Sequence, residues 1–350
     1  MSSFKIAVLP GDGIGPDVAN ESLKALSAVA AAIPTLHFQF DEFSVGAGEF
    51  LKSGNPLPEE TFAQFPNYDA ILLGAMGLPG VRWPDGKEMT PQIDLRERLD
   101  LYCGLRPIKT YHPNDTPLKS QKPIDFVLIR ESTEGLFAAR HGSADLNSDS
   151  ATDSMRITRH ASVRLFHSAF KLARTRRKKV TLIDKANVLP SMAYFRTIFN
   201  EIAKEYPDVE TEAHYVDAAA LFLVRRPWDF DVMVTENMFG DILSDLAAGL
   251  VGGMGMAPSA DLGDKYAVFQ PSHGTAPDIA GKGIANPVAM ILSAAMMLDW
   301  LPGEDAKRGG QIMHRAVAEV LADPANRTPD VGGTMKTHDL GDKIAQAVRV

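Results

Sequence analysis

The stretch DFDVMVTENMFGDILSDLAAGLVGG, residues 229–253, decides the fold class of this chain. Its first part is an almost unbroken apolar run, which is typical of a strand covered on both faces of a sheet. In the second part the apolar residues recur with a helical period. A buried strand that leads directly into a helix predicts an α/β protein, in which ligands bind where the strands end.

The same alternation recurs along the sequence. Apolar runs of strand length lie at residues 5–10, 69–76, 124–131 and 179–185, and helical patterns lie at residues 17–33, 191–206 and 287–301. Parallel strands connected by helices are the simplest arrangement for such a series. The sequence therefore predicts a largely parallel sheet with helices on its faces.

Composition argues against several classes of protein. The chain has 350 residues and a formal net charge of −8, which would repel the phosphates of a nucleic acid. Cys103 is the single cysteine, so no disulfide can form within the chain. The sequence lacks both a secretory signal pattern and an apolar run of membrane-spanning length. We expect a cytoplasmic protein with neither nucleic-acid nor membrane partners.

Asp241 and Asp245 lie four residues apart in the predicted helix and therefore share one face. Two carboxylates repel each other unless a cation lies between them, and Mg²⁺ or Mn²⁺ prefers oxygen ligands of this kind. A solvated acidic face is the alternative interpretation, because Ile242 and Leu243 share the segment. The position directly after a buried strand favours the metal site.

Arginines gather in LRERLDLYCGLRP, residues 95–107, and at the end of the strand predicted at 124–131. Arg96, Arg106 and Arg130 would form a carboxylate-binding group if the fold brought them together, because guanidinium forks match carboxylate geometry. Taken singly, each arginine is explained by a surface ion pair.

Two glycine-rich loops are candidates for ligand binding. GDGIGP, residues 11–16, lies between a strand and a helix, where a helix N-terminus favours an anion. Its spacing is not the dinucleotide fingerprint, and a tight turn explains it equally well. PSHGTAPDIAGKGIANP, residues 271–287, offers His273, Asp278 and Asn286 for hydrogen bonds. An acidic residue that binds ribose hydroxyls would repel a 2′-phosphate.

Two further charged residues lie beside predicted elements. Lys185 ends a strand, where it is either a salt-bridge partner or a proton shuttle. Asp217 begins the helical pattern in HYVDAAALFLV, where favourable interaction with the helix dipole is a sufficient explanation for a carboxylate.

Six long motifs follow one another along the chain: LPGDGIGPD, LRERLDLYCGLRP, IRESTEG, DKANVL, VTENMFGDILSDLAAGLVGGMGMAPSA and HGTAPDIAGKGIANP. On these motifs the chain strongly resembles the β-decarboxylating dehydrogenases, which include enzymes for isopropylmalate, isocitrate, homoisocitrate, tartrate and D-malate. The resemblance covers nearly the whole chain. DKANVL and TENMFGDILSD are most similar to the isopropylmalate branch.

The resemblance implies a two-domain α/β fold with a large mixed, mostly parallel sheet that is not a Rossmann fold. Residues 1–100 and 252–350 would form a large NAD-binding domain. Residues 101–251 would form a smaller domain that mediates dimerisation and holds metal and substrate. The expected assembly is a homodimer with shared active sites.

The resemblance also implies residue roles. Arg96, Arg106 and Arg130 would bind the carboxylates of a small dicarboxylate substrate. Asp241 and Asp245 would hold Mg²⁺ or Mn²⁺ together with Asp217 of the partner subunit. Lys185 of the partner subunit would work with that aspartate in proton transfer.

The residues that the resemblance assigns to NAD binding are Ile14, His273, Gly274, Thr275, Ala276, Asp278 and Asn286. Asp278 stands where the NADP-using members carry a lysine, so NAD is the expected cofactor.

Phe137 departs from the family pattern, because it occupies the position of a tyrosine that usually protonates C3 after decarboxylation. A phenyl ring cannot donate a proton. Either His141 or a water takes over this step, or the enol is released and tautomerises in solution, or the substrate is oxidised without decarboxylation. A weakened relative that only binds nucleotide or metal is a further alternative, which the intact Lys185 and Asp217 argue against.

Gln92 is a second departure, because the isopropylmalate enzymes have leucine there. An amide facing an isopropyl group would lose apolar burial worth about 1–3 kcal/mol. We therefore expect NAD- and metal-dependent oxidative decarboxylation of a (2R)-malate-type acid, most similar to that of isopropylmalate dehydrogenase. Tartrate or D-malate dehydrogenase is the alternative within the family.

Overall fold

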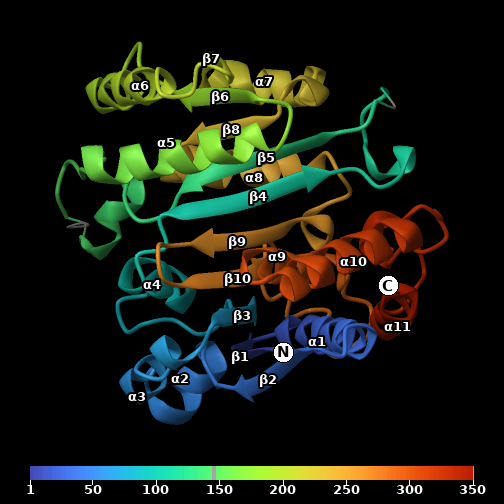
Figure 1. Ribbon diagram of the computed structural model, residues 1–350. Coiled ribbons are helices and arrows are strands. Elements are labelled where there is room, and N and C mark those ends of the chain that lie inside the picture. The colour runs from blue at the N-terminus through green and yellow to red at the C-terminus, as the bar shows by residue number, and fades with distance from the viewer. Residues whose placement is uncertain (121, 144–146, 350) are drawn as a thin grey trace.

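The computed structural model describes residues 1–120, 122–143 and 147–349. In this part of the chain a ten-stranded sheet runs through the whole molecule (Figure 1). Its strands, in spatial order, are β2 (Leu36–Glu42), β1 (Ser2–Gly11), β3 (Ala70–Ala75), β10 (Ala267–Pro271), β9 (Pro258–Leu262), β4 (Cys103–Lys109), β5 (Asp125–Glu131), β8 (Val232–Thr235), β6 (Lys179–Asp184) and β7 (Glu210–Tyr215).

Most neighbouring strands are parallel, and the antiparallel pairs lie together in the middle of the sheet. Those pairs are β10–β9, β9–β4 and β4–β5. The strands on either side of them pair in parallel, as βαβ connections require. The predicted mixed, mostly parallel sheet is confirmed. Its antiparallel centre and strand order distinguish it from a Rossmann fold.

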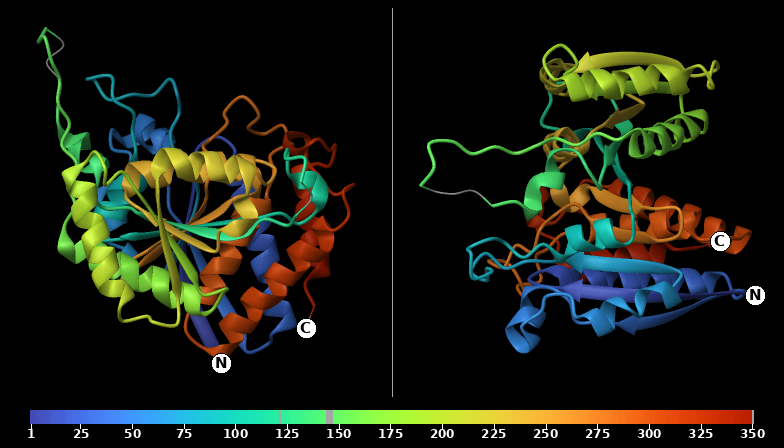
Figure 2. Two further views of the ribbon diagram at one scale, coloured as in Figure 1. Left: turned by 90° about the horizontal axis from the view of Figure 1, so that it is seen from above. Right: turned by 90° about the vertical axis from the view of Figure 1, so that its left-hand side faces the viewer.

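Helices cover both faces of the twisted sheet (Figure 2). The α-helices are α1 (Gly15–Ala32), α2 (Ala47–Ser53), α3 (Glu59–Phe62), α4 (Pro91–Arg98), α5 (Arg159–Arg174), α6 (Pro190–Ala203), α7 (Val216–Arg225), α8 (Asn237–Gly249), α9 (Val288–Trp300), α10 (Glu304–Leu321) and α11 (Thr337–Ala347). In the described part of the chain, no helix combines the length and apolar character needed to cross a membrane.

Alternation along β5 shows why the strands are almost continuously apolar. Val127 and Ile129 pack with residues of α5 and α6 on one face. Phe126 and Leu128 pack with residues of α7 and α8 on the other. Successive side chains of a strand point to opposite faces, so a sheet covered on both sides needs apolar residues at every position.

Buried apolar residues form separate cores at the two ends of the sheet. The cores around β1 and β3 draw on residues 4–101 and 256–344. The cores around β5, β6 and β8 draw on residues 102–251. Both chain termini belong to the first part (Figure 1). We propose that these parts are the two domains, residues 1–100 with 252–350 and residues 101–251, joined through the β9–β4 pair.

Candidate active site

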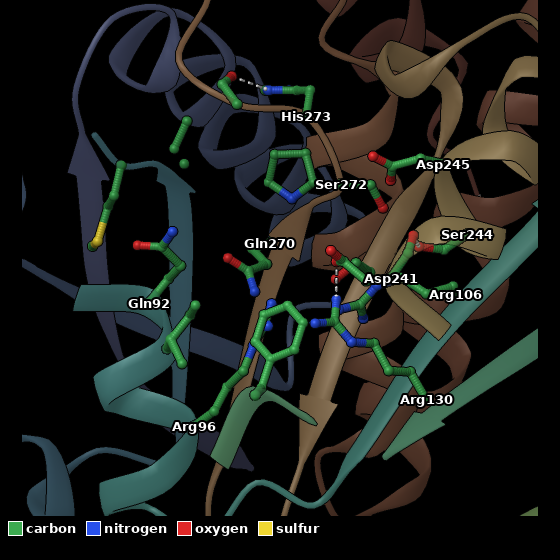
Figure 3. A pocket seen from close by; sticks show the side chains of 18 residues that line it. Gln92, Arg96, Arg106, Arg130, Asp241, Ser244, Asp245, Gln270, Ser272 and His273 are labelled. Carbon is green, nitrogen blue, oxygen red and sulfur yellow. Dashed lines mark hydrogen bonds and ion pairs between the residues drawn. The ribbon is translucent and has the colours of Figure 1, made fainter. Parts of the chain in front are cut away.

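A cavity of about 250 Å³ lies where both halves of the sheet contribute residues (Figure 3). The end of β3, helix α4 and the end of β10 bound it from one half. Strands β4 and β5 and helix α8 bound it from the other. The ends of β3, β5 and β10 are carboxyl ends, which is the edge where α/β sheets bind ligands.

Arg96, Arg106 and Arg130 converge on this cavity from α4, β4 and β5, and all three are buried. Arg130 donates from Nε to Oδ1 of Asn237 at 2.9 Å and pairs with Asp241. Burial, followed by the neighbouring Arg96, lowers the pKa of Arg130 to about 10. Arg130 therefore remains cationic at neutral pH. A cavity with this charge is suited to carboxylates.

Asp241 and Asp245 line the cavity from the first turns of α8, so the predicted shared face is directed at the cavity. The side chain of Glu236 caps this helix by accepting from the backbone N–H groups of Met238 and Phe239. Gly240 leaves room for Arg130, because a Cβ there would lie 2.7 Å from Cγ of that arginine. The local sequence thus places an acidic pair beside a buried cation.

The acidic pair fits a divalent cation. Burial, and then the charge of Asp241, raises the pKa of Asp245. Such a carboxylate gains from a cation that neutralises both groups, and two carboxylates are hard oxygen donors. No group of three possible metal ligands occurs among the residues that the structure describes. In the described part of the chain, Asp241 and Asp245 are the two carboxylates that line the cavity.

The loop at residues 272–274 carries polar atoms with no protein partner among the described residues, namely Oγ of Ser272 and Nε2 of His273. Burial lowers the pKa of His273, which favours the neutral ring. Its Nδ1 lies 2.9 Å from the carbonyl oxygen of Gly274. A carbonyl can only accept, so we assign the proton to Nδ1, which leaves Nε2 as an acceptor. Buried polar atoms of this kind fit a polar ligand such as a dinucleotide.

The remaining predicted cofactor residues are not among those that line the cavity. The N–H of Ile14 donates to the carbonyl oxygen of Thr275 at 2.8 Å, which joins the two glycine-rich loops. Ala276 has a φ of 35°, a strained value for a residue with a side chain. Asn286 is buried and donates to Asp330 at 3.1 Å. Asp278 is exposed and does not line the cavity.

Lys185 and Asp217 are not among the residues that line the cavity of this chain. They follow β6 and β7 at one edge of the sheet, and Nζ of Lys185 lies 2.7 Å from Oδ1 of Asp217. The hydrogen bond from Lys185 lowers the pKa of Asp217, whose side chain is 70% exposed. The predicted catalytic residues thus form an ion pair on the surface, separate from the arginines and from Asp241 and Asp245.

Gln92 and Phe137, the two departures from the family pattern, both line the cavity. Oε1 of Gln92 is buried without a described hydrogen-bond partner. The ring of Phe137 lies against Arg130, with 5.0 Å between the guanidinium carbon and the ring centroid. His141 does not line the cavity, and its Nε2 instead lies 3.0 Å from Glu97.

The sequence interpretation missed several residues of the site, among them Gln270 and Asp261. Gln270 lines the cavity, and Asp261 lies directly behind it with no exposed surface. The sequence did contain a signal for Asp261. An acidic residue inside the largely apolar segment APSADLG is expected to be buried, and a buried carboxylate needs a charged or hydrogen-bonding partner.

Residues 5–344 match the family model described as isocitrate/isopropylmalate dehydrogenase. The chain is 44% identical to a 3-isopropylmalate dehydrogenase of Aquifex aeolicus, over 99% of this chain and 97% of that protein. It is 42% identical to a 3-isopropylmalate/3-methylmalate dehydrogenase of Methanocaldococcus jannaschii, over 99% of both proteins.

Solved structures of similar fold are also dehydrogenases. An isocitrate dehydrogenase from Methylococcus capsulatus superimposes with a TM-score of 0.89 at 38% identity, covering 99% of this chain and 100% of that one. A beta-decarboxylating dehydrogenase from Thermococcus kodakarensis in its apo form superimposes with a TM-score of 0.82 at 37% identity, covering 99% and 96%.

Proposed function

The chain belongs to the isocitrate/isopropylmalate dehydrogenase family of oxidoreductases, and from this premise we propose its reaction and its cofactors. The proposed reaction is the oxidative decarboxylation of a (2R)-malate-type 2-hydroxy acid, as in 3-isopropylmalate dehydrogenase. NAD and Mg²⁺ or Mn²⁺ are the proposed cofactors, and the cytoplasm is the proposed location.

One observation carries this proposal: Arg96, Arg106 and Arg130 share a small cavity with Asp241 and Asp245. The arginines suit the two carboxylates of a malate-type acid. The aspartates suit a divalent cation beside its 2-hydroxyl group. A malate-type acid needs an anion site and a hard-cation site in the same cavity, and this cavity offers both.

In the proposed mechanism the arginines bind and orient the substrate carboxylates. When bound, NAD would supply the acceptor for hydride, and a divalent cation held by Asp241 and Asp245 would supply Lewis-acid stabilisation of negative charge. Lys185 and Asp217 accept the proton of the 2-hydroxyl group. Because the two side chains are in direct contact, they can pass this proton from one to the other. The β-carboxylate then leaves as carbon dioxide, and the electron pair of the broken carbon–carbon bond forms an enolate that is later protonated at C3.

A homodimer with shared sites completes this proposal, since Lys185 and Asp217 must come from a partner subunit. Exposed apolar side chains on α7 and α8 support an interface there: Leu221 is 53%, Val224 47% and Ile242 59% exposed. These helices pack against each other. A dimer through them would bury apolar surface next to the α8 residues that face the cavity.

Gln92 favours a second candidate within the same reaction class. An isopropyl group would leave its buried amide oxygen unpaired, whereas a hydroxyl group on C3 would donate to it. Oxidation of tartrate, which has a hydroxyl group on C3, is therefore the alternative function that Gln92 favours, and D-malate, with only hydrogen on C3, is the smaller acid of the same class. Late protonation is assigned to a water or to tautomerisation in solution, which the contact of His141 with Glu97 supports.

A substrate panel tests both candidates. The wild-type enzyme is assayed for NADH formation with 3-isopropylmalate, tartrate and D-malate in the presence of Mn²⁺, and release of carbon dioxide is measured by mass spectrometry. Gln92→Leu should raise kcat/KM for 3-isopropylmalate relative to tartrate by roughly 10-fold. An enzyme that forms no NADH from any of these acids contradicts the proposal. NADH without carbon dioxide establishes oxidation without decarboxylation.

A further inference from the structure

Asp261 lies on β9 and has no exposed surface, yet three residues that line the cavity bind its carboxylate. Arg96 donates from Nε to Oδ2 at 3.0 Å, and Arg106 donates from Nη2 to Oδ1 at 3.2 Å. The amide nitrogen of Gln270 donates to Oδ2 at 2.6 Å. Asp261 itself does not line the cavity. It is therefore placed to act on a ligand only through other residues.

The backbone makes specific room for this carboxylate. In the antiparallel β4–β9 pair, Gly104 lies opposite Asp261. A Cβ on Gly104 would come within 3.1 Å of Oδ1 of Asp261 and 2.6 Å of Oγ of Ser132. Glycine at this point of the strand thus permits an ionised side chain inside the sheet, where an apolar residue is the usual occupant.

The charge of Asp261 is compensated on the cavity side. Burial alone would raise the pKa of its carboxyl group, but Arg96 and Arg106 lower it to about 2. The carboxylate is therefore ionised at neutral pH. A buried ion pair contributes little net stability when compared with apolar packing, but it fixes the orientation of its partners.

Arg96 shows what this orientation achieves. Its Nε donates to Asp261, and no described residue accepts a hydrogen bond from its two terminal nitrogens. Arg96 lines the cavity, where it lies near Gln270 in Figure 3. Both terminal nitrogens of Arg106 are hydrogen-bonded. Nη2 donates to Asp261, and Nη1 donates to the carbonyl oxygens of Leu105 and Ala260. Neither guanidinium needs to reorganise before an anion arrives.

We propose that Asp261 is a positioning residue, which fixes Arg96 and Arg106 in the orientation that binds the substrate carboxylates. This inference rests on the proposed role of the two arginines. A purely electrostatic effect of Asp261 on the cavity predicts the opposite change in substrate binding. If Asp261 only lowered the positive potential of the cavity, its neutralisation would tighten the binding of a dianion. If it positions the arginines, neutralisation weakens binding.

Asp261→Asn is the test variant, because asparagine keeps the shape and one acceptor but loses the charge. Binding of D-malate is measured by calorimetry with Mn²⁺ present, so that the readout does not depend on turnover. We expect Kd to rise on the order of 10-fold, as when a partner that orients a binding group is removed. KM for D-malate or the best acid of the panel should rise in parallel, with a smaller change in kcat.

Asp115→Asn is the matched control. Asp115 is also a buried carboxylate paired with an arginine, Arg327, at 2.7 Å, but neither residue lines the cavity. Loss of this charge should lower Tm and leave Kd for D-malate unchanged. A purely structural role of Asp261 would give the same result, with Tm lowered and Kd unchanged, and would overturn the proposal.

A double-mutant cycle identifies the residue through which Asp261 acts. In Arg96→Lys the contact with Asp261 is already altered, so the further change Asp261→Asn should raise Kd much less than in the wild-type protein. Additive effects, or tighter binding in Asp261→Asn, contradict the proposal. A wild-type protein that binds D-malate but forms no NADH overturns the proposed reaction instead, and leaves the role of Asp261 supported by the binding data.

Discussion

The guanidinium carbon of Arg130 lies 5.0 Å from the centroid of the Phe137 ring, and both side chains line the same cavity. This geometry is a cation–π contact, which commonly contributes about 0.5–2 kcal/mol. The ring therefore holds Arg130, which we propose to bind substrate, without any need for a hydroxyl group. A phenylalanine at this position has a physical role even though it cannot donate a proton.

Phe137→Tyr keeps the contact with Arg130 and adds a phenol that can protonate C3. If late protonation limits turnover on a decarboxylated substrate, kcat should rise severalfold with little change in KM. Phe137→Leu removes the ring and should raise KM by weakening the position of Arg130. Steady-state kinetics on the best acid of the panel measures both. A lower kcat in Phe137→Tyr would show that protonation is handled elsewhere and that the ring shapes the cavity.

Asp245→Asn should weaken divalent metal binding, because a neutral amide replaces a charged oxygen ligand. We expect Kd for Mn²⁺, measured by calorimetry with D-malate present, to rise by roughly 10-fold or more. Glu304→Gln, which removes an exposed charge far along the chain on α10, is the control and should bind as the wild type does. Equal affinities in both variants would remove Asp245 from the metal site.

The raised pKa of Asp245 also predicts a pH-dependent stability in the absence of metal. A carboxyl group with a higher pKa in the folded state than in the unfolded state favours folding at low pH, and this contribution is lost as pH rises through the folded pKa. With EDTA present, Asp245→Asn should therefore raise Tm by about 1–2 °C near pH 7. The gain should shrink as pH falls towards 4, and a gain that grows on acidification would contradict the assignment.

Asp278 should direct the choice between cofactors, since its carboxylate would accept ribose hydroxyls and repel a 2′-phosphate. We expect kcat/KM to favour NAD over NADP by at least about 10-fold, and Asp278→Lys to narrow that ratio. Initial rates with both nucleotides provide the measurement. A wild-type preference for NADP would rule out the proposed role of the loop at residues 271–287.

A shared active site predicts complementation between two inactive variants. Homodimers of Lys185→Ala and of Arg130→Ala should each be nearly inactive. In a mixed dimer one site combines both wild-type residues and the other combines both changes. An equal mixture after subunit exchange should therefore recover about a quarter of wild-type activity, as follows for a twofold-symmetric dimer. Mass spectrometry of tagged subunits verifies exchange, and continued inactivity after exchange would exclude a composite site.

Local patterns in the sequence were sufficient for the fold class and for part of the site. Apolar runs of strand length and helical periods predicted an α/β protein with a mostly parallel sheet, which the strand pairing confirms. The spacing of Asp241 and Asp245 predicted a shared helix face, and both line the cavity. These features depend on residues that are close together in the chain, so backbone geometry alone determines them. The domain boundaries and the catalytic roles of Lys185 and Asp217 stay predictions.

The tertiary structure decided which distant residues act together. The contact between Arg96 and Asp261 joins residues that are 165 positions apart, and it exists only because β9 returns to pair with β4. No periodicity encodes such a contact. Sequence alone could name three arginines that suit a carboxylate, but only strand order shows that one buried aspartate holds two of them, because a charge can be buried only where the fold supplies its partners.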